Sequence, residues 1–276
     1  MFDLDFVTFG GGLRRYQDAA RRLGREAEES GVFAEVSVLT SRLLSHEFRR
    51  QHRPILRTSI PGYGYWVWKP HVIGEVLAAR RTEFVLYADA GCTLNLRSSA
   101  ARQRLGVYLD FASVHSVCSF SMPHLPENAW TKRDVRRHLG LDEKQQTSGQ
   151  RVGGVILFKR DQRSREIVET WNNLSTVDSY RLLDDSPSRC GEDEGFRRHR
   201  HDQSILSCIL KSMDIPALDD ETYFGADWHD SGSAYPIWAT RHCRPWSFGT
   251  EPSIAQRTLF HGIDAVDRSA RRLIRQ

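Results

Sequence analysis

The first forty residues alternate between apolar and amphipathic segments in a way that restricts the chain to few folds. Residues 5–9 form a short, mostly apolar run that favours a strand, and three glycines at 10–12 end it. Residues 13–27 repeat apolar side chains at steps of three and four, which predicts an amphipathic helix that ends at Gly31. Residues 32–39 predict a second strand. This order predicts an α/β fold with a mixed, mainly parallel central sheet flanked by helices.

Composition is that of a folded protein. Of the 276 residues, 39% are hydrophobic and 27% are charged, which excludes a peptide-sized or disordered chain. No apolar run approaches the roughly 18 residues of a membrane span, and the acidic N-terminus is unlike a secretory signal. Five scattered cysteines without a C-x-x-C spacing are unlike a disulfide framework or a zinc ribbon. We expect one domain over residues 1–276 in the cytoplasm.

Basic residues are abundant, but they only slightly outnumber the acidic ones. The net charge is +4, too small an excess to indicate nucleic-acid binding. The arginines of the first helix, which mostly lie off its apolar stripe, are Arg14, Arg15, Arg21, Arg22 and Arg25. A basic helical tail over about 265–276 can touch the inner face of an anionic membrane or a partner, or it is a solvated helix end.

Further apolar segments continue the α/β pattern. They predict strands at 83–88 and 152–159, helices after Pro70, around 167–174 and from His201, and a loop at 184–200.

An acidic residue follows the strand predicted at 83–88. The strand runs into Asp89-Ala90-Gly91-Cys92, and the carboxyl ends of strands are where open α/β sheets bind ligands. A carboxylate there can hold a cation that bridges two phosphates. The alternative is an aspartate that only caps a turn, which the spacing alone favours.

A second polar group opens the helix predicted from His201. His199, His201 and Asp202 suggest a metal-dependent hydrolase, but the pattern H-x-H-x-D-H is not met because Asp202 directly follows His201. Asp202 can be an ordinary N-cap. It can also face a crevice with Gln203 and contact a polyhydroxyl substrate. The basic side chains that can neutralise phosphate beside it are Arg197, Arg198 and Arg200.

An aromatic run and a distant histidine complete the candidates. Residues 63–68 are rich in tyrosine and tryptophan and precede Lys69. They either pack in the core or press rings against a base or sugar while Lys69 meets a phosphate. His261 is uninformative alone, but a neutral imidazole can join Asp89 in a metal site.

Taken in order, these motifs resemble glycosyltransferases of the GT-A fold. They are similar to glycosyltransferase family eight and to glycosyltransferases of capsule and exopolysaccharide gene clusters. The resemblance covers roughly residues 4–265. The stretches that carry it are FVTFG (6–10), GYGYWVWKP (62–70), YADAGC (87–92), GGV (153–155) and HDQS (201–204). The W-x-W-K-P and D-A-G-C pair is the most specific.

The resemblance implies roles for particular residues. Asp202 and Gln203 are the catalytic candidates, and Asp89 and His261 are the ligands of Mn²⁺ or Mg²⁺. The implied donor-binding residues are Thr8, Phe9, Gly10, Trp68, Lys69, Asp89, Ala90, Gly91, Gly154 and His201. Gly91 stands where the family usually has its second aspartate, and losing that carboxylate weakens the hold on a metal.

The implied activity is transfer of a sugar from a nucleotide-diphosphate sugar, a UDP-sugar, to a hydroxyl acceptor. It implies retention at the anomeric carbon and a role in polysaccharide or glycoconjugate synthesis. Two alternatives stay open. One is a catalytically silent domain that binds sugar nucleotides or glycans. The other is the metal-dependent hydrolase that uses His199, His201 and Asp202.

Overall fold

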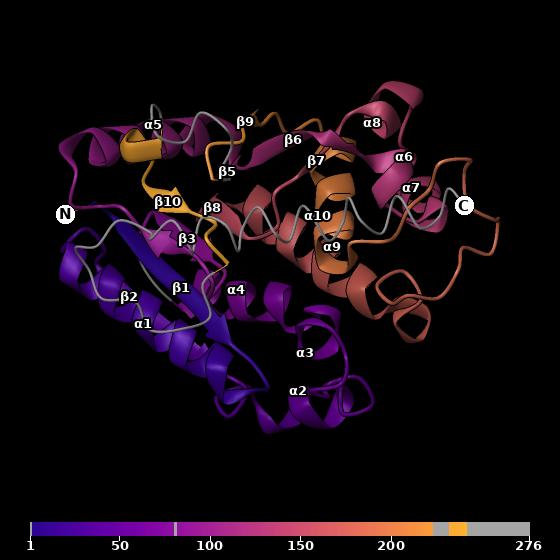
Figure 1. Ribbon diagram of the computed structural model, residues 1–276, viewed down its shortest axis with the longest axis horizontal. Coiled ribbons are helices and arrows are strands. Elements are labelled where there is room, and N and C mark those ends of the chain that lie inside the picture. The colour runs from indigo at the N-terminus through magenta and orange to yellow at the C-terminus, as the bar shows by residue number, and fades with distance from the viewer. Residues whose placement is uncertain (1, 80–81, 223–231, 242–276) are drawn as a thin grey trace, which may run out of the picture. The chain divides into compact units, whose positions relative to one another are not determined.

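The structure of the protein is a computed structural model that describes residues 2–79, 82–222 and 232–241 (Figure 1). The chain divides into a unit spanning Met1–Arg244 and a unit spanning Pro245–Gln276. All described residues belong to the first unit. The predicted basic tail and His261 lie outside the described residues, and the single-domain assignment stays a prediction.

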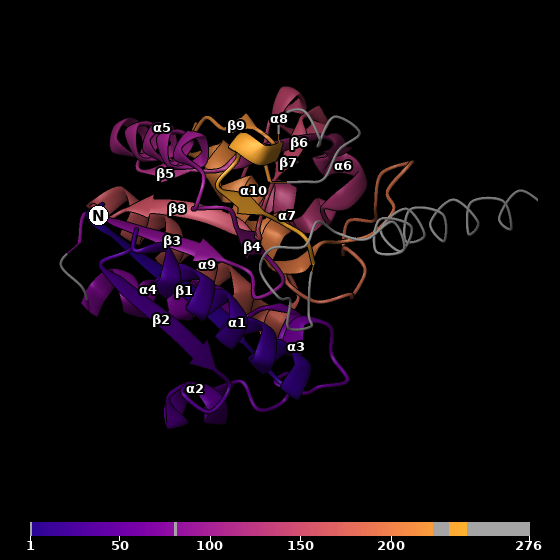
Figure 2. The same ribbon diagram turned by 60° about the vertical axis from the view of Figure 1, so that its left-hand side comes forward.

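A five-stranded mixed sheet forms the centre of the described part, in the order β2-β1-β3-β8-β5 (Figure 2). Its strands are β1 (Leu4–Gly10), β2 (Glu35–Thr40), β3 (Phe84–Ala88), β5 (Val117–Cys118) and β8 (Val155–Lys159). β1 pairs in parallel with both β2 and β3, whereas β8 pairs antiparallel with both β3 and β5. The predicted α/β class with a mixed sheet is confirmed.

Helices cover both faces of this sheet. The longer ones are α1 (Arg14–Ser30), α4 (Trp68–Ala79), α5 (Ser99–His115), α9 (Gln162–Tyr180) and α10 (His201–Ser212). Strand residues alternate between two apolar clusters, because successive side chains of a strand point to opposite faces. In β3, Val85 and Tyr87 pack with α4, α9 and α10. Phe84, Leu86 and Ala88 pack with α1 and α5.

Shorter elements join these layers. The strands are β4 (Thr93–Leu94), β6 (Phe120–Pro126), β7 (Gly149–Arg151), β9 (Leu218–Asp219) and β10 (Ile237–Trp238). The helices are α2 (His46–Gln51), α3 (Gly62–Tyr65), α6 (Glu127–Trp130), α7 (Arg133–His138), α8 (Glu143–Thr147) and the 3₁₀ turn η1 (Gly232–Ala234). β6, β7 and β9 form a small sheet, and β4 pairs with β10.

The predicted elements are present with shifted ends. The strand predicted at 32–39 begins at Glu35, and the one predicted at 152–159 begins at Val155. Residues 184–200 form neither helix nor strand, as predicted. Arg22 differs from its prediction, because it is 3% exposed and faces the protein interior. Within the described ranges, no helix is both long and apolar enough to cross a membrane.

Candidate active site

The strand order reverses between β1 and β3. The chain leaves β1 for β2 on one side and later returns to β3 on the other. The carboxyl ends of two parallel strands that diverge in this way leave a crevice, which is the usual ligand site of open α/β sheets. Gly10 ends β1 and Asp89 directly follows β3. The tertiary structure therefore puts both predicted donor-binding stretches at the same edge.

Lys69 connects Asp89 to Asp202 at this edge. Its Nζ lies 2.7 Å from Oδ2 of Asp202 and 3.3 Å from Oδ1 of Asp89, and it donates a hydrogen bond of 2.9 Å to the carbonyl oxygen of Gly153. The Tyr87 hydroxyl donates to Oδ1 of Asp89 at 2.6 Å. The Asp202 side chain is 5% exposed, whereas that of Asp89 is 39% exposed. Asp89 is therefore the carboxylate that a ligand can reach.

Burial and charge act against each other in this group, which we call the Lys69 cluster (Lys69, Tyr87, Asp89 and Asp202). Burial raises the pKa of Asp202 to about 6, although the Lys69 ammonium opposes the shift. Burial alone would lower the pKa of Lys69, but Asp202 and Asp89 outweigh it and the pKa is raised. Lys69 is therefore charged, and Asp202 changes its charge near neutral pH.

Two glycines just before β8, Gly153 and Gly154, lie close to the side chains of the site. The Asp89 backbone N–H donates to the carbonyl oxygen of Gly154 at 2.8 Å. A Cβ on Gly154 would lie 2.9 Å from Oδ2 of Asp89, and a Cβ on Gly153 would lie 2.8 Å from Cβ of Gln203. Position 153 needs glycine because the start of α10 approaches so closely, whereas a side chain at position 154 would push the Asp89 carboxylate aside.

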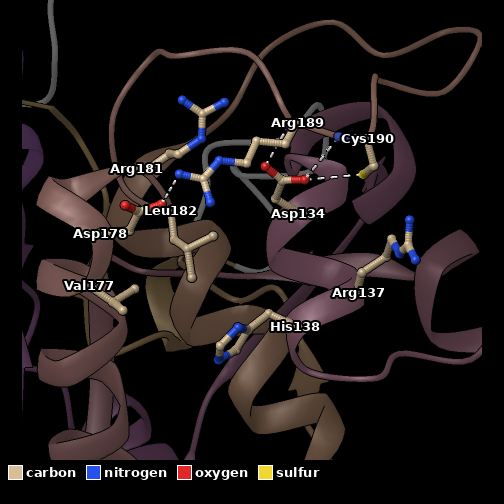
Figure 3. Close-up of a pocket in the computed structure, with 9 residues that line it drawn as sticks. All are labelled: Asp134, Arg137, His138, Val177, Asp178, Arg181, Leu182, Arg189 and Cys190. Carbon is tan, nitrogen blue, oxygen red and sulfur yellow. Dashed lines mark hydrogen bonds and ion pairs between the residues drawn. The ribbon is translucent and has the colours of Figure 1, made fainter.

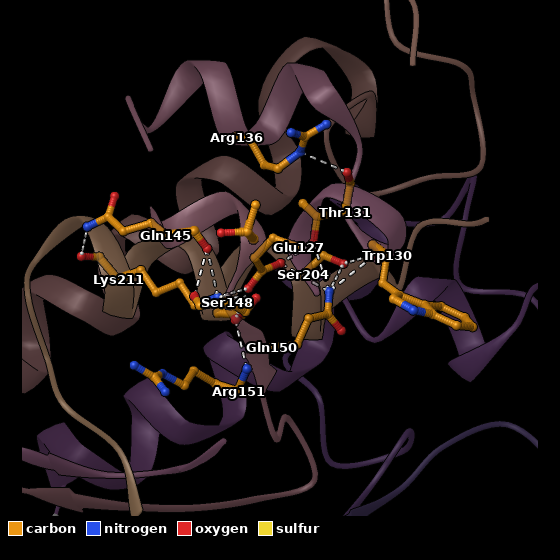
Figure 4. Close-up of polar contacts among 12 residues, drawn as sticks. Glu127, Trp130, Thr131, Arg136, Gln145, Ser148, Gln150, Arg151, Ser204 and Lys211 are labelled. Carbon is orange, nitrogen blue, oxygen red and sulfur yellow. Dashed lines mark hydrogen bonds and ion pairs between the residues drawn. The ribbon is translucent and has the colours of Figure 1, made fainter. Parts of the chain in front are cut away.

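Gln203 has both ends of its amide committed. Its Oε1 accepts from the backbone N–H of Gly153 at 3.3 Å, and its Nε2 donates to Oε1 of Gln150 at 2.7 Å. Gln150 in turn donates to Ser204 Oγ at 3.0 Å. The network continues to buried Glu127, whose Oε1 lies 2.9 Å from Nζ of Lys211 (Figure 4). Gln203 thereby joins the start of β8 to α10.

A buried ion pair fixes the loop after β3, a feature that the sequence did not reveal. Nη2 of Arg22 donates to the carbonyl oxygens of Ala90 at 3.0 Å and Cys92 at 2.7 Å, and Nη1 pairs with Glu26. From another direction, Thr240 Oγ1 donates to the carbonyl oxygen of Gly91 at 2.8 Å. The apolar spacing of α1 predicts a helix but cannot show that one of its arginines turns inward.

Two predicted donor-binding rings lie in the core. Trp68 stacks on Phe9 with ring centroids 3.9 Å apart, and its Nε1 donates to the carbonyl oxygen of Gly62 at 2.9 Å. Trp68 is 4% exposed, Phe9 is 3% exposed and Thr8 is fully buried. These buried residues pack in the core next to the site, and their contact with a donor stays a prediction.

His199 and His201, at or just before the start of α10, form hydrogen bonds to the backbone of neighbouring segments. Nε2 of His199 lies 2.9 Å from the carbonyl oxygen of Leu182, and Nδ1 accepts from the backbone N–H of Lys132 at 3.3 Å. Burial lowers the pKa of His199 well below its usual value. His201 Nδ1 lies 2.9 Å from the carbonyl oxygen of Leu183, and its ring stacks on Tyr65.

These contacts correct two of the alternatives. In the described part of the chain no group of three His, Cys, Asp or Glu side chains can hold a metal ion, and both nitrogens of His199 are occupied. The hydrolase hypothesis thus has no ligand set there. The N-cap interpretation of Asp202 is also wrong, because the N-cap residue of α10 is Arg200 and the Asp202 carboxylate faces Lys69.

Of the two predicted metal ligands, Asp89 lies within the described residues. Oδ1 of Asp89 is shared by Tyr87 and Lys69, and among the described residues Oδ2 makes no hydrogen bond or ion pair. One open carboxylate oxygen, with glycine at position 91, does not by itself fit Mn²⁺ or Mg²⁺, which bind several oxygen or nitrogen ligands. His261 lies outside the described residues, so its role stays a prediction.

A separate pocket of about 480 Å³ lies between α7 and the end of α9 (Figure 3). Asp134 accepts from the backbone N–H of Arg189 at 2.8 Å, and the Arg189 guanidinium pairs with Asp178 at 2.5 Å. No residue of the Lys69 cluster lines this pocket. We assign this pocket no role.

Comparison with known proteins identifies no family. No family model matches the chain, and no curated protein matches it. Among solved structures, the chain is similar to a glycosyltransferase involved in the glycosylation of the major capsid of PBCV-1. The two share 12% sequence identity over 90% of this chain and 94% of that chain, with a TM-score of 0.44. The assignment of function therefore depends on the site itself.

Proposed function

We propose that the protein is a GT-A-like glycosyltransferase that moves a sugar from a nucleotide-diphosphate sugar to a hydroxyl acceptor. The observation that carries the proposal is the meeting of Asp89 and Asp202 on Lys69 at the edge where the strand order reverses. That edge is where open α/β sheets bind nucleotides. The sequence resemblance given above adds a UDP-sugar donor, retention at the anomeric carbon and a glycan or other glycoconjugate acceptor.

Each residue of the Lys69 cluster has a role in this proposal. Asp89 is the exposed carboxylate and faces the donor. Tyr87 and Lys69 hold its Oδ1, at 2.6 and 3.3 Å, so the carboxylate is oriented before a ligand arrives and needs no reorganisation during reaction. Asp202 is the buried carboxylate at the start of α10, where it holds the Lys69 ammonium that in turn orients Asp89.

The chemistry needs charge stabilisation more than covalent catalysis. The bond between the anomeric carbon and the diphosphate oxygen breaks, and its electron pair leaves with the diphosphate. The acceptor oxygen bonds to the anomeric carbon and loses its proton to the departing diphosphate oxygen. A carboxylate near the anomeric carbon stabilises the positive charge that the sugar gains, and the site holds donor and acceptor in reacting geometry. No step is assigned to a metal ion.

The test is a screen of nucleotide sugars by thermal shift, with and without Mn²⁺, followed by an assay of nucleotide release. A ligand that binds the folded state raises the melting temperature by mass action. We expect one class of UDP-sugar to raise the melting temperature and to be turned over. Asp89→Asn should reduce turnover at least about 100-fold, as loss of a key transition-state contact does.

Asp110→Asn is the matched control, because Asp110 is an exposed aspartate of α5. Wild-type turnover in Asp89→Asn would remove the proposal. Donor binding without any nucleotide release or transfer would instead support the silent binding domain, for which Gly91 in place of a second aspartate is the specific argument.

A further inference from the structure

Three arginines lie just before Asp202 of the Lys69 cluster, and within the described ranges none of them forms an ion pair with a carboxylate. Arg197, Arg198 and Arg200 come just before α10, and their Cζ atoms lie 5.6, 5.9 and 5.9 Å from the ring centroid of Trp130. Arg200 is the N-cap residue of α10 and is half-buried. Three guanidinium groups therefore gather around one indole ring at the start of the helix that carries Asp202.

Arg241, at the C-terminal end of the described chain, acts on the same group of arginines. The hydroxyl of its neighbour Thr240 donates a hydrogen bond of 2.8 Å to the carbonyl oxygen of Gly91. The hydroxyl oxygens of Thr240 and Thr93 lie 3.0 Å apart and share a hydrogen bond. Arg241 thus follows a residue anchored on the loop after β3. Its charge acts directly on Arg200. The segment that carries Arg241 is therefore tied to the loop after β3.

The charge of Arg200 is unfavourable in the protein as it stands. Burial lowers the pKa of Arg200 to about 10, and the nearby charges of Arg241 and Arg198 add to the shift, against Asp202 and Glu127. Those two carboxylates pair instead with Lys69 and Lys211. Among the described residues no carboxylate forms an ion pair with Arg200.

Three other arginines with buried side chains pair with carboxylates. Arg22 pairs with Glu26, Arg136 with Asp193, and Arg160 with Asp5. Holding a partly buried cation beside like charges costs stability unless an anion joins it. Arg200 forms no such pair among the described residues and lies beside the like charges of Arg198 and Arg241, so it indicates a place that an anionic ligand completes.

We propose that Arg198, Arg200 and Arg241 bind the diphosphate of the nucleotide-sugar donor. Guanidinium groups make paired hydrogen bonds to phosphate oxygens, and the N-terminus of α10 adds backbone N–H groups. Lys69 cannot take this part, because Asp89, Asp202 and Gly153 occupy its ammonium. The arginines supply positive charge at the start of α10, whereas the resembled family holds a metal with a second carboxylate at the position of Gly91.

During transfer the same group would stabilise the leaving diphosphate. As the bond to the anomeric carbon breaks, its electron pair goes to the diphosphate oxygen, and the guanidinium charges face that oxygen. This inference rests on the proposed function for the identity of the diphosphate. Binding of the diphosphate alone can be measured without any sugar transfer.

The experiment is calorimetric titration of the full-length protein with inorganic pyrophosphate and with UDP, both in EDTA. We expect wild-type protein to bind both ligands, and Arg200→Gln and Arg241→Gln each to weaken binding about 10-fold or more, as for loss of a charged hydrogen bond. The double variant should show no measurable binding. Arg14→Gln is the control, because the Arg14 side chain is 93% exposed and its loss removes the same charge.

Stability gives an independent readout. If Arg200 were only structural, Arg200→Gln would lower the melting temperature of the ligand-free protein. Because its charge is unfavourable there, we expect the melting temperature to stay the same or rise while diphosphate affinity falls.

Three outcomes would overturn the arginine site. They are no binding by wild-type protein in EDTA, binding by Arg200→Gln and Arg241→Gln within twofold of wild type, and an equal loss in Arg14→Gln. Nucleotide-sugar turnover with unchanged diphosphate binding in the variants would remove the site and leave the transferase. Diphosphate binding that depends on Arg200, without turnover of any nucleotide sugar, would leave the site and remove the transferase.

Discussion

The ammonium nitrogen of Lys69 lies 2.7 Å from Oδ2 of Asp202, which joins the start of α4 to the start of α10. Asp89 lies on the same ammonium from the end of β3. Three segments far apart in the chain thus meet through one cation. The first two predictions follow from the balance of burial and charge at this point.

The pH dependence of stability should report Asp202. Its pKa is raised to about 6 in the folded protein from the 3.8 of a free aspartate, so the folded state binds more protons than the unfolded state between these values. The free energy of unfolding should therefore fall as pH rises through this interval, by on the order of 2 to 3 kcal/mol. Chemical denaturation at a series of pH values measures the slope. Asp202→Asn should lack it, and an equal slope in both proteins would contradict the assignment.

Removing the Lys69 ammonium should destabilise the protein, because Asp202 and Asp89 then lose their cation. Lys69→Met leaves Asp202 buried without its partner, which should destabilise the protein by about 3 to 5 kcal/mol at neutral pH. At about pH 5 part of this loss should be recovered, because Asp202 then takes up a proton. Denaturation at both pH values tests this. The control is Lys159→Met, since Lys159 lies 3.9 Å from Glu83 in a more exposed pair, and a pH-independent loss in Lys69→Met would count against the prediction.

A substitution at Gly154, just before β8, should affect donor binding more than stability. A methyl group on Gly154 would lie 2.9 Å from Oδ2 of Asp89, so Gly154→Ala should displace this carboxylate and reduce donor binding, measured by thermal shift, with a small effect on the apo melting temperature. In Gly106→Ala the added methyl group meets nothing within 4 Å. Because Gly106 lies inside α5, the free energy of unfolding of that variant should rise by about 1 kcal/mol, and it should bind the donor as the wild type does. Normal donor binding by Gly154→Ala would show that the close approach at Asp89 is unimportant.

The buried arginine of α1 should be essential for the loop after β3. Arg22→Leu leaves Glu26 buried without its cation and frees the carbonyl oxygens of Ala90 and Cys92. We expect a loss of about 3 to 5 kcal/mol and loss of donor binding. Its neighbour Arg21 is 53% exposed and pairs with Asp18, so Arg21→Leu should change stability by less than about 1 kcal/mol. Similar melting temperatures for the two variants would refute the structural role of Arg22.

The local elements of this protein could be predicted from the sequence. The apolar run of β1, the spacing of α1 and the polar stretch at 184–200 each depend on neighbours along the chain, and periodicity records such neighbours. Asp89 could be placed at the end of a strand for the same reason. Its role could not, because a turn aspartate and a ligand-binding aspartate have the same local pattern.

Tertiary structure decided which polar side chains meet. The sequence did not show that Lys69 would be buried between Asp89 and Asp202, nor that Arg22 would turn toward the interior. It also suggested that Asp202 caps α10, whereas the carboxylate faces Lys69. Burial and charge pairing depend on segments that approach only when the sheet and its helices close, so an ion pair between distant segments leaves no periodic trace in the sequence.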